Sequence, residues 1–223
     1  MPEESICFIT CVNDEKIYGE SRLYAEHLHT DLPVEFIPVR GASSMAAGYN
    51  WAMRQSRARY KIYLHQDVLI VEKNCIKMLC ELFLKYRQLA MLGVIGAETL
   101  PPSGVWWGSG KNYGRVLHAA EPESISPSVC LPVNEWKAVE ALDGLFLATQ
   151  RDLPWREDLF DGWHFYDVSQ CMEFKRQGYQ TAIPEQTSDW CLHLTRQKPL
   201  DASYWKYQQI FLREYEDDME SHR

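Results

Sequence analysis

The first hundred residues alternate short apolar runs with segments of helical periodicity, and this order restricts the fold more than any other feature of the chain. The apolar runs have strand length and are found at residues 5–12, 34–39, 60–71 and 90–97. The helical segments are residues 18–29, 45–57 and the stretch that follows Asn74. Such alternation predicts an α/β domain with a mostly parallel sheet and right-handed crossovers. We expect Ser43 or Ser44 and Asn74 to cap helices, and Pro38 to lie at a strand end or a sheet edge.

The run at 60–71, YKIYLHQDVLIV, is interrupted by His65, Gln66 and Asp67. A buried strand that ends in polar groups has this pattern, and in open α/β sheets ligands bind at that edge. Asp67, alone or with His65, could therefore bring a divalent cation to an anionic ligand, because a cation beside a diphosphate needs only one or two protein carboxylates. The alternative interpretation is that Asp67 is an ordinary turn residue or helix cap.

Charge and length narrow the classes of function. The net charge of -8 at pH 7 argues against a general nucleic-acid binder, which would need a surplus of Lys and Arg. An anionic ligand would need local help from a cation or a helix N-terminus. A chain of 223 residues with 46% hydrophobic content predicts a single domain, 1–223.

We expect a cytoplasmic protein without a membrane span. No segment approaches the roughly 20 apolar residues that would cross a bilayer. The first residues, MPEESICFITCVND, are acidic and lack the pattern of a signal peptide. The 7 cysteines are scattered without metal-site spacing, so they are predicted to be core residues of a reducing compartment.

Residues 99–135 interrupt the alternation with a stretch rich in Pro, Gly and Ser that contains Trp106 and Trp107. Their rings could stack on a sugar or a base, or fill the core beneath the loop. Beyond this insertion the predicted elements are a strand pair or bent strand from 136 with Asp143 and Gly144 at its bend, a helix at 166–177 stopped by Gly178, a strand at 181–183 and an amphipathic helix at 203–219.

The segment LFDGWHFYDVSQC places Asp161 and Asp167 around an aromatic patch that includes His164. Asp167 opens the predicted helix and could be its N-cap or a general base in a cleft. His193 is a second candidate metal ligand, although a lone histidine is more often structural. The chain lacks GxxxxGKS/T, GxGxxG, GxSxG and HExxH, which excludes P-loop kinases, typical dinucleotide enzymes, α/β-hydrolases and zincin proteases.

Together these pieces resemble the GT-A glycosyltransferases of the family-2 type, and most closely the small branch related to the StrF-like streptomycin-biosynthesis domain. The resemblance rests on SSMAAGYNWAMRQSRARYKIYLHQDV, on ALDGLFLATQRDL, and on FDGWHFYDVSQCMEFKRQGYQTAIP with a downstream His. It spans the first strand to about Thr195. It implies a GT-A-type, Rossmann-like α/β fold, with a nucleotide-sugar-binding half at 1–98, an aromatic Gly-rich insertion at 99–135, an acceptor and catalytic half at 136–198 and a C-terminal helix at 199–223.

The resemblance also implies roles for single residues. Asp67 matches the second carboxylate of the family's DxD motif and, with His193 as the late ligand, would bind Mn²⁺ or Mg²⁺, while His65 stands at the place of the first Asp. Asp167 matches the catalytic base, and Asp161 is a further catalytic candidate. The nucleotide-sugar-binding candidates are His65, Gln66, Asn50 and Asn13. The acceptor-binding candidates are Asp143, Gly144, Trp106, Trp107 and His164.

The activity implied is metal-dependent, inverting transfer of a sugar from a nucleoside-diphosphate sugar, expected to be a UDP-sugar, to a hydroxyl of a glycan or small molecule, as in polysaccharide biosynthesis. The C-terminal helix could join two copies of the chain. A non-catalytic GT-A-like module that binds a nucleotide sugar or a glycan is the first alternative, because the first Asp of the motif is missing. A sugar nucleotidyltransferase is the second, but it would need a Gly- and Lys/Arg-rich loop where this chain has CVNDEKIYGE.

Overall fold

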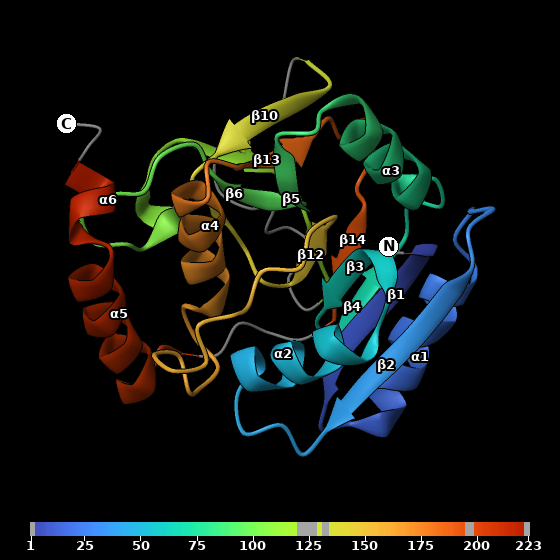
Figure 1. Cartoon of the computed structure of the whole chain (residues 1–223), viewed down its shortest axis with the longest axis horizontal. Helices are drawn as coiled ribbons and strands as arrows, with labels where there is room; N and C mark the ends of the chain where they lie inside the picture. The colour runs from blue at the N-terminus through green and yellow to red at the C-terminus, as the bar shows by residue number, and fades with distance from the viewer. Residues whose placement is uncertain (1–2, 120–128, 131–133, 195–198, 221–223) are drawn as a thin grey trace.

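A computed structural model describes residues 3–119, 129–130, 134–194 and 199–220, and its centre is a seven-stranded sheet (Figure 1). The strands of this sheet are β1 Glu3–Val12, β2 Val34–Arg40, β3 Ala58–Leu64, β5 Leu89–Gly93, β10 Trp136–Val139, β12 Phe146–Thr149 and β13 Gln180–Pro184. Their spatial order is β10-β13-β5-β12-β3-β1-β2. Three neighbouring pairs are parallel and three are antiparallel. The predicted α/β architecture is confirmed, but the sheet is mixed rather than mostly parallel, because β12 runs antiparallel to β3 and β5 and β10 runs antiparallel to β13.

Strand β3 lies inside the sheet, and residues 60–64 are all buried. Pro38 lies in β2, which is the outermost strand on one side, as expected for a residue without a backbone donor. The apolar run at 60–71 is two strands rather than one, because β4 Val68–Ile70 leaves the central sheet and pairs with β14 Cys191–His193. The run at 90–97 likewise divides at Val94 into β5 and β6 Ile95–Ala97. Periodicity could not reveal these breaks, since both pieces of each run are buried.

Six α-helices pack around the sheets in the described part of the chain (Figure 1). They are α1 Glu15–Glu26, α2 Met45–Gln55, α3 Cys75–Lys85, α4 Tyr166–Arg176, α5 Ala202–Glu214 and α6 Glu216–Glu220. Ser44 caps α2, because its hydroxyl accepts the Ala47 N–H at 3.1 Å. Asn74 occupies the N-cap position of α3, but its side chain makes no capping bond, so that part of the prediction is wrong. Gly178 follows α4 with φ of 78°, as a helix stop requires.

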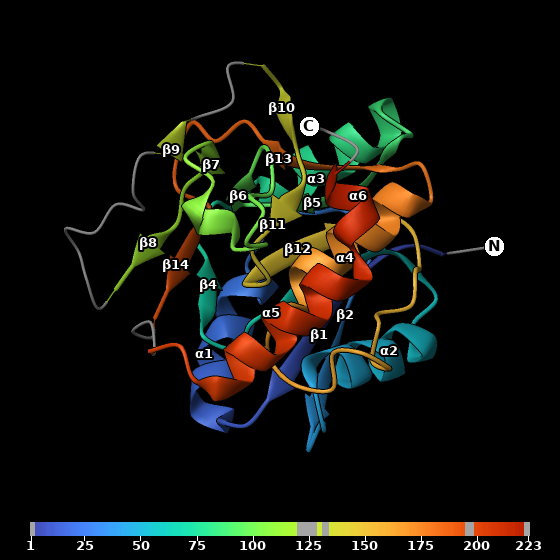
Figure 2. The ribbon, with the colours of Figure 1, turned by 90° about the vertical axis from the view of Figure 1, so that its left-hand side faces the viewer.

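The C-terminal helix α5 lies alongside α4 in both views (Figures 1 and 2). Its predicted apolar face is confirmed, and Tyr204, Tyr207, Phe211 and the following Tyr215 are buried. This face packs within the chain, so it is not available to a second copy. A homo-oligomer contact through this helix remains a prediction, and it would have to use another face of the helix.

The predicted insertion contains short elements, and its residues 120–128 and 131–133 lie outside the described part. The described elements are the 3-10 turn η1 Trp106–Gly108 and strands β7 Asn112–Gly114, β8 Leu117–His118 and β9 Val129–Cys130. Strands β7 and β9 join β6 and β11 Ala141–Leu142 in a small sheet of order β11-β6-β7-β9 (Figure 2). Strand β8 joins β4 and β14 in a second small sheet of order β4-β14-β8. None of the helices in the described ranges has the length and hydropathy to cross a bilayer.

Candidate active site

Three polar side chains converge where β3 leaves the central sheet. The ligand atoms of His65, Asp67 and His193 all lie within 4.8 Å of one another. His193 Nε2 and Asp67 Oδ2 are 3.2 Å apart, and both side chains are mostly buried. One carboxylate and two imidazoles form a donor set that fits a transition-metal dication, whereas Mg²⁺ prefers oxygen ligands throughout.

Strand pairing, rather than proximity in sequence, builds this cluster. β14 runs antiparallel to β4 with His193 opposite Val68, and the Leu194 N–H donates to the Asp67 carbonyl at 2.9 Å. β8 joins β14 on its other side, and the ring of His118 lies 5.5 Å from that of His193. His118 had no signal in the sequence, because only this pairing brings it near the cluster.

The pKa values of the two histidines are shifted in opposite directions. Burial lowers the pKa of His65, which favours the neutral imidazole that a metal ligand must be. Burial also opposes the charged form of His193, but the Asp67 carboxylate outweighs it and raises the pKa of His193. The Nδ1 atom of His193 is buried without a hydrogen-bond partner among the described residues. A cation beside Asp67 would favour neutral His193 as a ligand, and the carboxylate and two imidazoles present fit the predicted metal site.

A cavity of about 160 Å³ adjoins the cluster, and His65 forms part of its wall. The lining residues are His65, Gly104, Trp106, Asp143, Gly144, Trp163, His164, Phe165, Tyr166, Asp167, Val168 and Tyr204. His65 Nε2 is 2.6 Å from the Tyr166 hydroxyl, which joins the cluster to the start of α4. The cavity thus brings most of the predicted acceptor-side residues together with the predicted base.

Asp167 lies in the first turn of α4 and faces this cavity. Its carboxylate accepts the N–H groups of Gly144 and Val168, each at 2.9 Å. Burial, together with the nearby charge of Asp143, raises the pKa of Asp167 to about 7. The N-cap of α4 is Phe165, so the alternative in which Asp167 is the cap does not hold. A carboxylate with this pKa is suited to act as a general base near neutral pH.

Two backbone features hold Asp167 in place. A Cβ at Gly144 would lie 2.1 Å from the Tyr166 hydroxyl, so this close approach needs glycine. Phe165 has φ of 60°, a left-handed conformation that costs a bulky residue roughly 1–3 kcal/mol and is typical of functional sites. The chain therefore enters α4 through a strained residue two positions before the predicted base.

The carboxyl ends of the parallel neighbours β1 and β3 meet beside Asp67. Gln66 Oε1 accepts the N–H groups of Asn13 and Asp14 at 2.9 and 3.0 Å, and Gln66 Nε2 donates to Asn13 Oδ1 at 2.5 Å. The predicted donor-side residues Asn13 and Gln66 are therefore in contact at the ligand-binding edge of the sheet.

Asn50 and Asp161 do not join the site. Asn50 is 2% exposed, and its amide bonds to both the N–H and the carbonyl of Trp155 at 2.8 Å, so a direct donor contact is not supported. Asp161 is exposed and accepts bonds from Tyr207 and Lys206 of α5, away from the cavity-lining residues. Both side chains have structural partners that the sequence could not show.

The two tryptophans of the insertion differ in burial, so the core-filling and ligand-stacking alternatives do not apply to both alike. Trp106 is 8% exposed and lines the cavity, whereas Trp107 is 44% exposed. Their rings meet edge to face at 5.7 Å. His164 also lines the cavity, and burial lowers its pKa.

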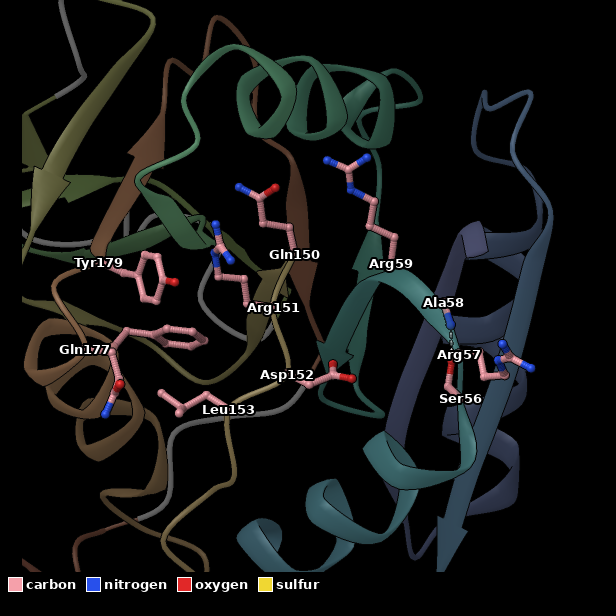
Figure 3. A pocket seen from close by; sticks show the side chains of 11 residues that line it. Ser56, Arg57, Ala58, Arg59, Gln150, Arg151, Asp152, Leu153, Gln177 and Tyr179 are labelled. Carbon is pink, nitrogen blue, oxygen red and sulfur yellow. Dashed lines mark hydrogen bonds between the residues drawn. The ribbon is translucent and has the colours of Figure 1, made fainter. Parts of the chain in front are cut away.

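A larger cavity of about 670 Å³ lies elsewhere, at the amino end of β3 (Figure 3). Arg59 and Arg151 lie on its wall, and Arg151 stacks over the Tyr179 ring. None of the predicted site residues lines this cavity. Its position at the opposite end of the strand from His65 separates it from the cluster.

Residues 7–215 match the model of a family described as Glycosyltransferase like family. The chain belongs to this glycosyltransferase-like family. A search of curated proteins found no match.

Solved glycosyltransferases share the fold of this glycosyltransferase-like chain. GalNAc-T7 with UDP, GalNAc and Mn²⁺ aligns with a TM-score of 0.67 at 10% identity over 97% of this chain and 50% of the other. S. aureus TarS 1–349 with UDP-GlcNAc aligns at 0.56 and 9% over 88% and 60%. The mannosyltransferase PcManGT from Pyrobaculum calidifontis, with GDP-Man and Mn²⁺, aligns at 0.54 and 10% over 99% and 66%. At these identities the likeness establishes the GT-A fold, and this chain spans about half to two thirds of the length of those chains.

Two tyrosines of the candidate site were missed in the sequence. Tyr166 bonds to His65, and Tyr204 closes the cavity from α5. Tyr166 precedes the predicted base directly, which is the only signal that could have identified it. Tyr204 was predicted only as part of an apolar helix face.

Proposed function

We propose that this chain is a metal-dependent, inverting glycosyltransferase that moves a sugar from a nucleoside-diphosphate sugar, expected to be a UDP-sugar, to an acceptor hydroxyl. One observation carries the proposal: His65 belongs both to the cluster with Asp67 and His193 and to the wall of the cavity that holds Asp167. A cation-binding cluster and a base with a pKa near 7 thus face adjoining space. Structural neighbours bound to UDP or GDP-Man with Mn²⁺ support the choice of donor and cation.

Asp67 and His193, with His65 as a third candidate, would hold the cation, and we favour Mn²⁺ because two of the three ligands are imidazoles. When bound, the cation supplies positive charge to the leaving diphosphate. Asn13 and Gln66 would lie beside the nucleotide, because they meet at the carboxyl ends of β1 and β3. In this proposal, residues 1–98 bind the donor, and residues 136–198 together with the insertion bind the acceptor.

Asp167 would take the proton from the acceptor hydroxyl. The acceptor oxygen then forms a bond to the anomeric carbon while the bond from that carbon to the diphosphate oxygen breaks. The nucleoside diphosphate leaves with the electron pair, Asp167 is left protonated, and attack from the opposite side inverts the anomeric centre. Asp143, Gly144, Trp106, Trp107 and His164 would position the acceptor, and the partly buried cavity limits transfer to water.

We also propose a cytoplasmic location for the protein and a place near the StrF-like branch. Cys7, Cys75, Cys171 and Cys191 are buried free thiols, which favours a reducing compartment such as the cytoplasm. The tripeptide at 65–67, HQD, is the feature on which we place the chain near the StrF-like branch.

Titration of UDP with and without Mn²⁺ tests the metal site. We expect Mn²⁺ to tighten UDP binding by the wild type at least tenfold, and Asp67→Ala to lose this gain while UDP alone binds as before. Asp31→Ala is the matched control, because Asp31 is an exposed carboxylate outside the cluster. Equal Mn²⁺-dependent binding by Asp67→Ala and the wild type would show that the metal role is wrong.

A panel of nucleotide sugars then tests turnover by the wild type. Sugar transfer or donor hydrolysis supports a glycosyltransferase. Tight UDP and Mn²⁺ binding without turnover of any donor would favour the non-catalytic module. Release of pyrophosphate from a nucleoside triphosphate and a sugar phosphate would favour a nucleotidyltransferase.

A further inference from the structure

Four aromatic side chains either line the cavity that holds Asp167 or contact a ring that lines it. They are Trp107, Trp163, Tyr204 and Trp205, and we call them the aromatic rim. Trp163 and Tyr204 line the cavity itself. The three tryptophans are 44%, 48% and 49% exposed in sequence order. Exposed tryptophans that line a cavity or contact its wall mark a binding surface rather than a core.

Tyr204 makes the rim continuous between two distant parts of the chain. Its ring centroid lies 5.7 Å from that of Trp107 in the insertion and 5.3 Å from that of Trp205 in α5. The ring of His164 lies 5.4 Å away on the cavity side. The insertion and α5 therefore contribute to one surface.

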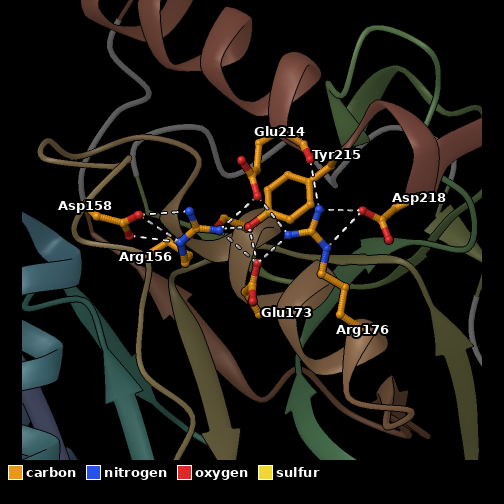
Figure 4. A network of polar contacts seen from close by, with 8 residues as sticks. Arg156, Asp158, Glu173, Arg176, Glu214, Tyr215 and Asp218 are labelled. Atoms are coloured by element: carbon orange, nitrogen blue, oxygen red, sulfur yellow. Dashed lines mark hydrogen bonds and ion pairs between the residues drawn. The ribbon is translucent and has the colours of Figure 1, made fainter.

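Ion pairs and hydrogen bonds fix α5, which carries half of the rim, to α4, which carries the proposed base (Figure 4). Arg156 and Arg176 each contact both Glu173 of α4 and Glu214 of α5, with N to O distances of 2.9 to 3.3 Å. The buried Tyr215 hydroxyl donates to Glu173 at 2.8 Å. This network attaches the C-terminal end of α5 to α4.

The size of the cavity limits what it can hold. Its volume of about 160 Å³ is below the roughly 300–1,000 Å³ of sites that enclose a whole ligand. Only a small part of an acceptor fits beside Asp167, and the remainder must lie on the rim. Polar groups lie beside the flat rings of the rim, since His164 contacts Tyr204 and its Nε2 atom lies 3.9 Å from the Asp201 carboxylate. Sugar rings present both apolar C–H faces and hydroxyl edges, which this combination suits.

We propose that the acceptor is a carbohydrate chain of at least two sugar units. The terminal unit enters the cavity and offers its hydroxyl to Asp167, and the preceding unit stacks on Trp107 and Trp205. This inference rests on the proposed function and names the acceptor class of the same site.

The test uses the full chain and an array of mono- to hexasaccharides, read with and without UDP and Mn²⁺, followed by titration of the glycans that bind. We expect binding of di- and longer saccharides in preference to monosaccharides. Trp205→Ala should weaken that binding about fivefold to tenfold, and Trp205→Phe should retain most of it. Leu84→Ala is the matched control, because Leu84 of α3 is 49% exposed, as Trp205 is, and lies outside the rim.

UDP binding in the presence of Mn²⁺ is titrated separately for each variant, and it should stay within about twofold of the wild type. If the wild type binds UDP and Mn²⁺ but no saccharide on the array, the acceptor is not a carbohydrate and the inference is overturned while the proposed function stands. If Trp205→Ala binds the glycan as tightly as the wild type does, the rim is not the contact surface and the inference is likewise overturned.

Discussion

At the scale of single residues, the surroundings of Asp167 decide what the cavity can do. Two backbone N–H groups stabilise the charged carboxylate, whereas burial and Asp143 destabilise it, and the second influence is larger because the pKa is raised to about 7. An aspartate on the surface would be fully ionised at neutral pH and a weaker base.

The rate of sugar transfer should therefore depend on the ionisation of Asp167. The base works only when it is deprotonated, so the rate at saturating substrate should be low at pH 6, rise through about pH 7 and level off above it. Asp143→Asn should move this limb to lower pH, because it removes the neighbouring negative charge. Asp167→Asn should lower the rate by a factor of about 10²–10⁴ and should retain UDP binding. A flat profile between about pH 5.5 and 8 in the wild type would contradict a base with this pKa.

Gly144 should tolerate no side chain. In Gly144→Ala the new Cβ would overlap the Tyr166 hydroxyl, so either the start of α4 or the bend must move. We expect a loss of about 1–3 kcal/mol in the free energy of unfolding and a reduced transfer rate, measured by denaturant titration and activity. Gly19→Ala is the control, because a Cβ in this helical position meets nothing within 4 Å and should be neutral or stabilising. Wild-type stability and rate in Gly144→Ala would show that the bend can adjust.

At the scale of elements, the site depends on strands that are too short to predict and on one helix pair. β4 and β14 have three residues each, yet their pairing is what places His193 beside Asp67. The α4 and α5 pair determines the other half of the site. In that pair, buried polar contacts add to the packing of the apolar face.

Tyr215→Phe tests how much those polar contacts contribute. The change removes the hydroxyl that bonds to Ser169 and Glu173 and leaves the buried ring in place. We expect the free energy of unfolding to fall by about 1–2 kcal/mol, since Ser169 and Glu173 lose a partner in a buried position. In Tyr86→Phe, where the hydroxyl bonds to Glu135 at the surface, the loss should stay below about 0.5 kcal/mol. Similar losses in both variants would mean that burial of the network has no special weight.

At the scale of the whole molecule, the net charge of -8 sets the conditions for binding an anionic donor. A negative protein repels a nucleoside diphosphate at long range, so the donor needs a local positive charge, which a cation at the His65, Asp67 and His193 cluster would provide.

UDP with Mn²⁺ should therefore stabilise the entire fold. At about 100 times the dissociation constant the gain is about 2.7 kcal/mol, which for a chain of this size corresponds to a rise in Tm of roughly 5–10 °C. The rise should require both UDP and Mn²⁺ and should be absent in Asp67→Ala, as measured by thermal unfolding. A full rise with UDP alone would place the stabilising contacts outside the metal cluster.

The sequence by itself determined the α/β order, the break at 65–67 and the candidates Asp67 and Asp167, because each depends on local patterns of burial and polarity. The sequence also offered His193 as a candidate metal ligand, and the resemblance to GT-A enzymes added the nucleotide-sugar and acceptor assignments. Which of these residues meet depends on the tertiary structure. Hydrophobic periodicity reports that a face is buried but not what covers it, so it could not show that β12 enters the sheet antiparallel or that the run at 60–71 divides between two sheets. For the same reason the sequence pattern suggests Asn50 and Asp161 as site residues, although Asn50 bonds to Trp155 and Asp161 bonds to Tyr207 of α5. The same pattern gives no sign that Tyr204 of α5 lines the cavity. Contacts between residues more than a hundred positions apart, such as His193 with Asp67 and Tyr166 with His65, depend on long-range pairing and packing that no local pattern contains.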